Sequence, residues 1–346
     1  MKHLVLGTTA LILSGTVAVA GGLDRSGQSI TSIFENGTYV ELSFGQISPT
    51  VKGTMLGVPL PSGDVGPTYT QFGVAAKFDI NDKLSMGIII DQPFGADVSY
   101  ETAGYPLDTS NAAVTTTAIT VLGRYKISDA FSVHGGLRQV TASGHYDPAG
   151  PYASTYSSGS DTGYVLGAAF ERPEIALRVA LTYSSATSFT LPGTVGDVSG
   201  DMPQSVNLDF QTGVAANTLV FGSIRWADWT NTALVDSVAG TLIDYDHDVM
   251  TYSLGVGRKF SDSFSGALTL GYEKAQGGLA SNLSPTDGYM SIGLGGTYTK
   301  GNMKITGGLR YVKLGDATTE PLGAFPGATF SGNSAVGVGV KVAFTF

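Results

Sequence analysis

The last twelve residues of the chain alternate strictly between apolar side chains and small or polar ones. The apolar positions share one face of an extended segment: Val336, Val338, Val340, Val342, Phe344 and Phe346. A period of two residues predicts a β-strand. Because the opposite face holds mostly Gly and Ala with Lys341, the pattern is typical of a strand between lipid and a lumen.

The same alternation recurs along the chain, for example in residues 37–46, 175–184, 205–211, 264–273 and 303–311. Short turns alternate with longer Gly/Ser/Thr/Pro-rich loops, which lie roughly at 50–68, 93–113, 145–162, 185–203, 230–248, 275–287 and 315–333. These connections separate about fourteen strands, an even number typical of outer-membrane barrels. We therefore predict an all-β fold, a transmembrane antiparallel β-barrel over residues 37–346 with an N-terminal plug. A closed barrel leaves no strand edge unpaired in lipid.

The N-terminus has the pattern of a secretory signal peptide. Lys2 and His3 precede the apolar run from Leu4 to Leu13, and Ala18-Val19-Ala20 fits a cleavage site. We predict that residues 1–20 are the signal peptide. Residues 21–36 lack strand alternation, and a wide barrel has room for them in its lumen. They are expected to form a plug (hatch), the alternative being a disordered periplasmic tail.

Composition removes several classes of protein. The 346 residues include 48 Gly, no Cys and only 14% charged residues, so disulfide scaffolds and Cys-based zinc sites are excluded. Beyond the N-terminus there is no apolar run near the ~20 residues that a spanning helix needs. The net charge is −9 with scattered Lys and Arg, which disfavours nucleic acid as a partner because that binding needs a basic patch.

Aromatic residues gather beside the predicted turns, as interfacial girdles do. They are Tyr125, Phe131, Phe170, Trp226, Trp229, Phe260, Phe264, Tyr298 and Phe346. The alternative is the ordinary preference of aromatic residues for strands.

Charged residues alternate with apolar neighbours, so they are expected to face the lumen. They are Glu41, Arg124, Arg138, Arg178, Asp209, Arg225, Glu273, Arg310 and Lys341. Unpaired charge in a confined lumen is costly, so we expect pairing among them or with Asp24, Arg25 and Glu35 of the plug. A sharper hypothesis assigns Arg138 and Arg178 to an anionic substrate group, since Arg binds a carboxylate with two parallel hydrogen bonds.

Two of the long loops are more apolar than solvated loops usually are. Residues 145–160 carry Tyr146 and Tyr152, and residues 184–202 carry Phe189 and Leu191. Exposed apolar clusters indicate a hydrophobic ligand or a membrane-facing surface. We predict these four residues as substrate-binding; the alternative is a lid in which the loops only pack on one another.

Signals for catalysis or metal binding are weak. Ser132 and His134 share a face, but their spacing alone does not make the oriented pair that a barrel phospholipase needs. Residues Asp244 to Asp248 lack the spacing of a calcium loop. We expect no enzyme activity, no catalytic residues, no metal site and no cofactor.

Four stretches give the chain a resemblance to the long-chain fatty acid outer-membrane transporter family. The first is AGGLDRSGQSITSIFENGTYVELSFGQISPTVKG, from the plug into the first strand. The second is Asp91 to Asp97, the third runs from Leu191 to Val206, and the fourth from Phe221 to Trp229.

The resemblance implies a hydrophobic-compound channel with an N-terminal hatch that would include Asp24, Arg25, Phe34 and Glu35. It also implies capture at extracellular loops and lateral release at a kink in the third strand. The kink would involve Gly87, Pro93, Phe94 and Gly95, since Pro93 cannot donate a ladder hydrogen bond.

The expected function is passive uptake of long-chain fatty acids or similar hydrophobic molecules across the Gram-negative outer membrane. The expected partners are that ligand and outer-membrane lipid, with the barrel acting as a monomer. The alternatives are a general diffusion porin for polar solutes, a barrel phospholipase and a structural or adhesive barrel.

Overall fold

The computed structural model describes residues 23–148 and 150–346. The predicted signal peptide, residues 1–20, lies outside the described residues. The described helices are three short 3₁₀ turns, η1 (Thr31–Phe34), η2 (Pro173–Ile175) and η3 (Trp229–Asn231). None of them is long and apolar enough to cross a membrane.

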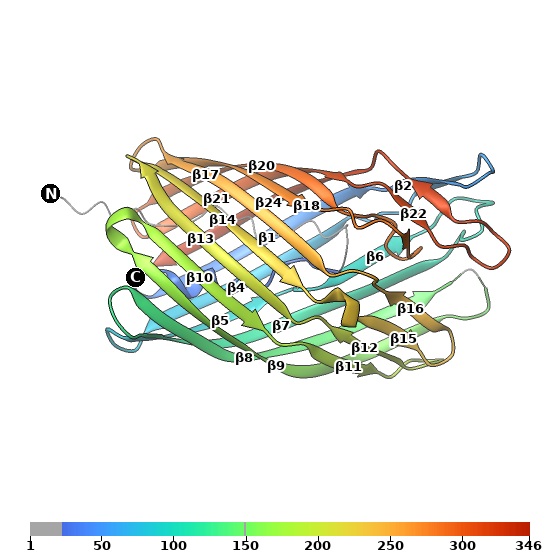
Figure 1. Ribbon diagram of the computed structural model, residues 1–346, viewed down its shortest axis with the longest axis horizontal. Coiled ribbons are helices and arrows are strands. Elements are labelled where there is room, and N and C mark those ends of the chain that lie inside the picture. Colours follow the sequence, from blue (N-terminus) through green and yellow to red (C-terminus); the bar gives the residue numbers. More distant parts are fainter. Residues whose placement is uncertain (1–22, 149) are drawn as a thin grey trace.

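Fourteen antiparallel strands form one closed barrel (Figure 1). In wall order they are β1 (Tyr39–Thr50), β4 (Tyr69–Asp79), β5 (Leu84–Asp91), β7 (Asn111–Lys126), β8 (Phe131–Asp147), β9 (Ser154–Arg172), β10 (Leu177–Ser184), β13 (Ser205–Ala215), β14 (Thr218–Ala227), β17 (Val249–Lys259), β18 (Phe264–Glu273), β20 (Tyr289–Lys300), β21 (Met303–Leu314) and β24 (Ser334–Thr345). The first and last strands close the wall, with register from Tyr39↔Thr345 to Thr50↔Ser334. The fourteen-stranded barrel predicted from alternation is confirmed.

The outer surface of the barrel is apolar and its inner surface is polar. Along β24, Val336, Val338 and Val340 are between 42% and 51% exposed. The charged residues predicted to face the lumen are buried or half-buried; Arg138 is 4% exposed and Arg225 5%. Because apolar side chains cover the outside of a sheet without free edges, the molecule is built as an outer-membrane-type barrel.

Exposed aromatic residues lie beside the short turns, at the end of the barrel where the C-terminus lies (Figure 1). Tyr125, Phe131 and Phe260 are 49%, 56% and 62% exposed there. This matches the predicted girdle. The prediction was wrong for Trp229, which is fully buried and packs edge-on against Phe94 with ring centroids 5.8 Å apart. Trp229 follows a strand end in the sequence, where an interfacial position was expected, but η3 directs its ring toward the protein interior.

The long connections, extracellular in barrels of this kind, form two small sheets at the opposite end (Figure 1). One contains β11 (Thr187–Leu191), β12 (Val198–Met202), β15 (Ala233–Asp236) and β16 (Gly240–Asp244). The other contains β19 (Leu279–Ala280), β22 (Ala317–Thr319), β23 (Ala328–Phe330), β2 (Lys52–Met55) and β3 (Pro61–Asp64). Pairing satisfies backbone groups that irregular loops would leave to water.

The predicted loop at 145–162 is also mostly strand. Strand β8 continues to Asp147 and β9 begins at Ser154, and the two pair as far as Tyr146↔Ser154. The Tyr, Thr and Ser residues that suggested a loop have side chains that suit a pleated surface as well. Tyr146 therefore lies on a strand.

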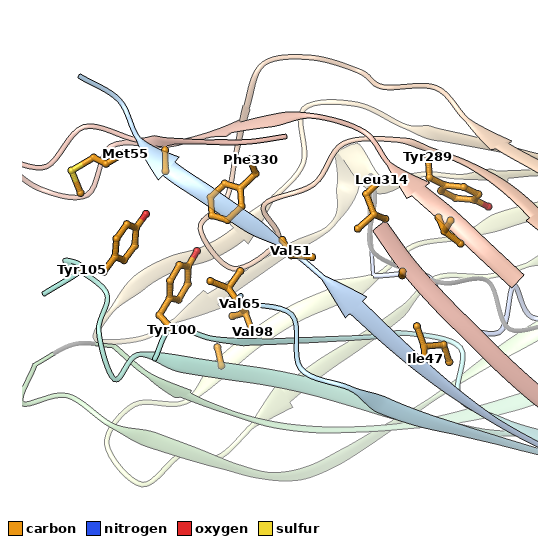
Figure 2. Close-up of a cluster of buried hydrophobic side chains, with 14 residues drawn as sticks. Ile47, Val51, Met55, Val65, Val98, Tyr100, Tyr105, Tyr289, Leu314 and Phe330 are labelled. Atoms are coloured by element: carbon orange, nitrogen blue, oxygen red, sulfur yellow. The ribbon is translucent and has the colours of Figure 1, made fainter. Parts of the chain in front are cut away.

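An apolar core supports the second outer sheet (Figure 2). Phe330 is fully buried in it, and a Cβ at Gly53 on the neighbouring strand would lie 2.8 Å from that ring, so only glycine fits there. Tyr100 and Tyr105 stack with centroids 5.7 Å apart, and the Tyr100 hydroxyl donates to the Asn282 carbonyl at 2.7 Å. This core therefore connects the segment after β6 (Gly95–Ser99) to distant parts of the chain.

Candidate functional site: a break in the barrel wall

The wall is interrupted between β4 and the third barrel strand. That strand consists of β5 and β6, separated by Gln92, Pro93 and Phe94. Among the described residues, β4 pairs with β5 only from Val74↔Ile90 to Asp79↔Ser85. The outer part of β4, Tyr69–Gly73, thus has no ladder partner on this side; the Phe72 N–H donates instead to the side chain of Gln92 at 3.0 Å.

The kink expected between Gly87 and Gly95 therefore falls at 92–94. Gly87 lies within the paired part of β5, between Lys77 and Leu122. Phe94 is fixed to β7 by the side chain and the backbone of Thr116. Its N–H donates to Thr116 Oγ1 at 2.9 Å, and its carbonyl accepts from the Thr116 hydroxyl at 2.7 Å and from the Thr116 N–H at 3.2 Å. The interruption is thus ordered and hydrogen-bonded.

The N-terminal segment, residues 23–36, pairs with this interruption. Arg25 N–H donates to the Pro93 carbonyl at 2.7 Å, and Gly95 N–H donates to the Leu23 carbonyl at 2.8 Å. These bonds form an isolated antiparallel bridge between Asp24 and Phe94. A Cβ at Gly95 would lie 2.7 Å from the Arg25 guanidinium, so the absence of a side chain there lets the segment approach the wall.

Inward-facing side chains hold the rest of the segment. Arg225 binds Asp24 with Nη2 at 2.7 Å and Nε at 3.2 Å, as expected for a lumen charge paired with the predicted plug. Ser26 donates to Asp91, and the amide of Asn207 donates to the Gly27 carbonyl at 2.8 Å.

The far end of the segment packs against cationic residues of the lumen. The guanidinium groups of Arg124 and Arg178 lie 4.7 and 4.8 Å from the centre of the Phe34 ring. Glu35 interacts electrostatically with Lys304 and Arg178. The hatch residues predicted from sequence, Asp24, Arg25, Phe34 and Glu35, thus all contact or face the barrel wall.

A cavity of about 150 Å³ lies between the segment and the wall beside the break. Its lining includes Ser26 and Ser29 of the segment, Gly45 and Gly73 of β1 and β4, and Gln92 at the break. Inward-facing glycines leave this space because they carry no side chain.

An apolar pocket of about 50 Å³ lies at the outer end of the barrel. Three of the residues predicted to bind substrate, Tyr146, Phe189 and Leu191, line it together with Met202 and Leu242. The pocket is continuous with a buried apolar cluster that runs through Trp229 to Phe94 and Leu23. Apolar side chains therefore connect the outer pocket with the wall break.

Tyr152, the fourth aromatic or apolar residue predicted to bind substrate, lies beside the pocket and anchors a carboxylate. Its ring is 6.0 Å from that of Tyr146, and its hydroxyl donates to Asp236 at 2.6 Å, as Tyr156 does at 2.7 Å. Burial alone raises the pKa of Asp236, but bonds from Tyr152, Tyr156 and two backbone N–H groups outweigh it and lower the pKa to about 2.

Arg138 and Arg178 are buried in the lumen, apart from the apolar pocket. Arg138 donates to the hydroxyls of Thr120 and Ser184 at 2.8 and 2.9 Å, and Arg178 donates to Gln211 at 3.0 Å. A ligand carboxylate would have to join or displace these partners. Their assignment to an anionic substrate group stays a prediction.

Ser132 and His134, the candidate catalytic pair, interact with other residues. The hydroxyl of Ser132 accepts from Arg124 Nε at 3.0 Å, and His134 Nε2 lies 3.0 Å from the Thr182 hydroxyl. Within residues 23–148 and 150–346, no group of three or more His, Asp or Glu side chains is placed to hold a metal ion.

Sequence reasoning missed three groups at the break: Gln92, Thr116 and Trp229. The Gln92 side chain accepts from the Phe72 N–H in place of a ladder bond, the Thr116 hydroxyl bonds Phe94 beside a backbone bond, and Trp229 packs on Phe94. An amide or hydroxyl residue beside Pro93 is a usable signal for such a replacement, because Pro93 interrupts the ladder. The role of Trp229 required the fold.

Several solved structures share this fold over nearly the whole chain. A FadL homologue from Pseudomonas aeruginosa is 13% identical with a TM-score of 0.77, covering 96% of this chain and 97% of its own. The toluene transporter TodX from P. putida is 12% identical with a TM-score of 0.69, covering 91% and 92%. The toluene transporter TbuX from Ralstonia pickettii is 14% identical with a TM-score of 0.61, covering 90% of each chain. No protein-family model and no curated protein matches the sequence.

Proposed function

We propose that the chain is a passive outer-membrane channel for hydrophobic molecules, with residues 23–36 as its plug. Ligands enter the apolar pocket at the outer end, follow the buried apolar cluster to Phe94, and leave sideways through the wall break. A hydrophobic solute gains nothing by crossing a water-filled pore, because each CH₂ kept from water is worth about 0.8 kcal/mol.

The observation that carries this proposal is the position of the wall break. The outer part of β4 lacks its ladder partner where the internal cavity and the N-terminal segment meet the wall. An unsatisfied backbone group in lipid costs several kcal/mol, so a break bridged by side chains and by a separate segment indicates a site of passage. The fold that the chain shares with a FadL homologue and with toluene transporters supports the same function.

The proposed ligand class includes both long-chain fatty acids and small neutral hydrocarbons. Engineered apolar cavities of about 150 Å³ in other proteins bind benzene, whereas the apolar outer pocket of this chain holds about 50 Å³. The pocket must therefore widen when a ligand enters, through movement of side chains such as Leu191 and Leu242.

Uptake into a strain from which the gene is deleted, with and without a plasmid copy, tests the proposal. Radiolabelled oleate and toluene are the two probes, and faster uptake of at least one of them with the plasmid is expected. Equal uptake in the two strains would overturn the proposal. Large steady conductance of the wild-type chain in planar bilayers would favour a porin for polar solutes instead.

A charge placed in the apolar pocket provides the matched variant. Leu191→Asp puts a carboxylate among apolar residues, and we expect uptake of the hydrophobic probe to fall by about tenfold or more, since a buried charge costs more than one methylene contributes. Val195→Asp is the control, because Val195 is 55% exposed on the same connection. Unchanged uptake by the Leu191 variant would contradict the entry route.

A further inference from the structure

Three lysines stand apart from the other exposed cations of the chain. Within the described part of the chain, Lys52, Lys274 and Lys313 are the exposed Lys and Arg side chains at the outer end of the barrel. The remaining exposed ones lie beside the short turns: Lys83, Lys126, Arg172, Arg258 and Lys300. The three lysines belong to one part of the wall, in which the strand order is β1, β24, β21, β20 and β18. Exposed positive charge at the outer end is thus confined to one side of the barrel.

The pairing register places these lysines on the outer face of the wall. The cross-strand row through Lys313 contains Tyr272, Met290, Ser334 and Thr50. Lys274 and Lys52 each follow a member of this row by two residues, and the residue between is buried in both cases. Side chains two residues apart share a face of a strand. Successive lysines are therefore two strands and two residues apart, which separates their Cα atoms by about 12 Å.

The ammonium groups of the three lysines have no partner among the described residues, neither in a hydrogen bond nor in an ion pair. The nearby acids bind backbone instead. Asp64 lies opposite Lys52 in the β2–β3 ladder but accepts a backbone N–H at 2.8 Å. Asp316 follows Lys313 by three residues and accepts a backbone N–H at 3.1 Å, and Asp287 accepts two, at 2.9 and 2.7 Å. The lysines are thus available to an anion from outside the chain.

An apolar and aromatic surface lies directly below two of the lysines. Tyr272 and Tyr311 precede Lys274 and Lys313 by two residues and are 45% and 48% exposed, and exposed aromatic rings of this kind mark the membrane interface. On β20, which lies between their strands, Ile292 is 46% exposed. A molecule with an anionic head and apolar chains can therefore contact the lysines and this surface at the same time.

The wall formed by β7, β8 and β9 has no such cations at its outer end. Hydroxyl groups take their place and bond to one another. Thr141 and Ser160 lie 2.7 Å apart, and Thr115 and Ser143 lie 3.3 Å apart. These exposed pairs carry no charge. The two sides of the barrel therefore present different chemistry to the lipid headgroups around them.

We propose that Lys52, Lys274 and Lys313 bind one lipid of the outer leaflet whose headgroup carries two phosphates, with its acyl chains along β20 and β21. Phosphate oxygens accept short, charge-assisted hydrogen bonds from ammonium groups, and lysines at a membrane surface attract anionic lipids. One phosphate cannot reach all three lysines across separations of about 12 Å, whereas two phosphates on linked sugars can. The site is independent of the molecule that the channel carries.

Native mass spectrometry of the full chain, delipidated in a mild detergent, tests this site. The probes are diphosphoryl lipid A, monophosphoryl lipid A with the same acyl chains, and phosphatidylethanolamine. We expect one molecule of the diphosphoryl lipid to bind about fivefold or more tightly than the monophosphoryl lipid, because the second phosphate engages at least one further lysine. Phosphatidylethanolamine should bind more weakly than either.

Two matched triple variants locate the site. Lys52→Gln, Lys274→Gln and Lys313→Gln together should weaken the diphosphoryl lipid by about a hundredfold, and Lys→Arg at the same positions should retain it. Lys83→Gln, Lys126→Gln and Lys300→Gln remove the same charge beside the short turns and should bind as the wild type does. Heat-dependent electrophoretic mobility shows that each variant has folded as a barrel.

The outcomes separate this site from a general effect of charge and from the proposed function. Equal weakening by the two glutamine triples would show that the lipid responds only to net charge, and equal affinity for the two forms of lipid A would show that the second phosphate is not bound; either result would overturn the site. Uptake of oleate and toluene by the outer-end glutamine triple should stay at the wild-type level, so loss of the lipid site would leave the proposed function standing.

Discussion

Two stretches of the barrel wall satisfy the hydrogen-bonding groups of their backbones in different ways. Strands β7 and β8 pair without interruption from Asn111↔Asp147 to Lys126↔Ser132, whereas β4 loses its partner beyond Val74. In lipid every backbone polar group needs a partner within the protein. The β7–β8 wall meets that need through its ladder alone. At the break, the Phe72 N–H of β4 donates to the Gln92 side chain, and the N-terminal segment bonds the Pro93 carbonyl and the Gly95 N–H of the third strand. Such bonds can open without separating the paired strands of the sheet.

The largest expected effect comes from removing the charge that holds the N-terminal segment. Arg225→Met leaves Asp24 buried without its partner, and losing one side of a buried pair costs about 3–5 kcal/mol. We expect the segment to leave the wall and the steady conductance in planar bilayers to rise. Conductance equal to that of the wild type would show that the segment is held by other contacts.

Two controls accompany this measurement. Asp24→Asn combined with Arg225→Met removes both charges and should restore most of the closure. Arg172→Met breaks a pair whose side chains are 55% and 62% exposed, and such pairs contribute at most about 1 kcal/mol, so conductance should not change.

A reversible cross-link between the segment and the wall tests whether passage requires them to separate. Ser26 and Asp91 are hydrogen-bonded and the natural chain has no cysteine, so Ser26→Cys with Asp91→Cys introduces the only thiol pair. Oxidation should reduce ligand uptake by about tenfold or more, because the closed contact can no longer open, and a reductant should restore it. Each single cysteine variant is the control. Uptake that continues through the oxidised protein would exclude a route past this contact.

Protonation of Asp236 should loosen the first outer sheet while leaving the barrel wall intact. Its folded pKa of about 2 lies below the ordinary value of about 3.9, so its stabilisation is present above about pH 4 and is lost as the pH falls toward 2. Hydrogen exchange in β11, β12, β15 and β16, corrected for intrinsic rates, should accelerate over that range. Asp236→Asn should lose this pH dependence, whereas Asp201→Asn should keep it; identical profiles for wild type and Asp236→Asn would contradict the assignment.

The smallest effect is expected at the side chain that spans the break. Gln92→Leu removes the acceptor for the Phe72 N–H. Because one hydrogen bond contributes a net free energy of about 1 kcal/mol, we expect the hydrogen exchange of the Phe72 amide to become several-fold faster. Gln92→Glu keeps the acceptor and should behave as wild type. The amide of Val74, which remains in the ladder, provides the internal reference; equal acceleration of both amides would mean that the strand had frayed as a whole.

The barrel was predictable because lipid enforces a simple rule. Every wall strand must alternate between apolar and polar sides, so residues such as Val338 and Arg138 reveal their faces from sequence alone. The same rule marked Arg225 and Lys341 as lumen charges. The partners of these charges could not be predicted from the sequence. Asp24 lies 201 positions from Arg225, and only the closed fold brings the two residues together.

The outer end was harder to predict because water imposes no such alternation. Strands β12 and β15 pair although they belong to connections that are distant in sequence. Asp236 accepts hydrogen bonds from two tyrosine hydroxyls, one on β9 and one in the turn before it. Trp229 looked like an interfacial residue because it follows a strand end. Its burial depends on Phe94 and Tyr245, which arrive from other connections.

The seam between β1 and β24 has a consequence for how the protein is made. Neighbouring strands elsewhere in the wall follow one another along the chain, but this seam joins Tyr39 to Thr345, and bringing such distant residues together carries the largest loss of chain entropy. Closure therefore needs both terminal strands of the wall. A chain truncated before Ser334 would leave β1 and β21 as two open edges, and open edges of this kind template aggregation.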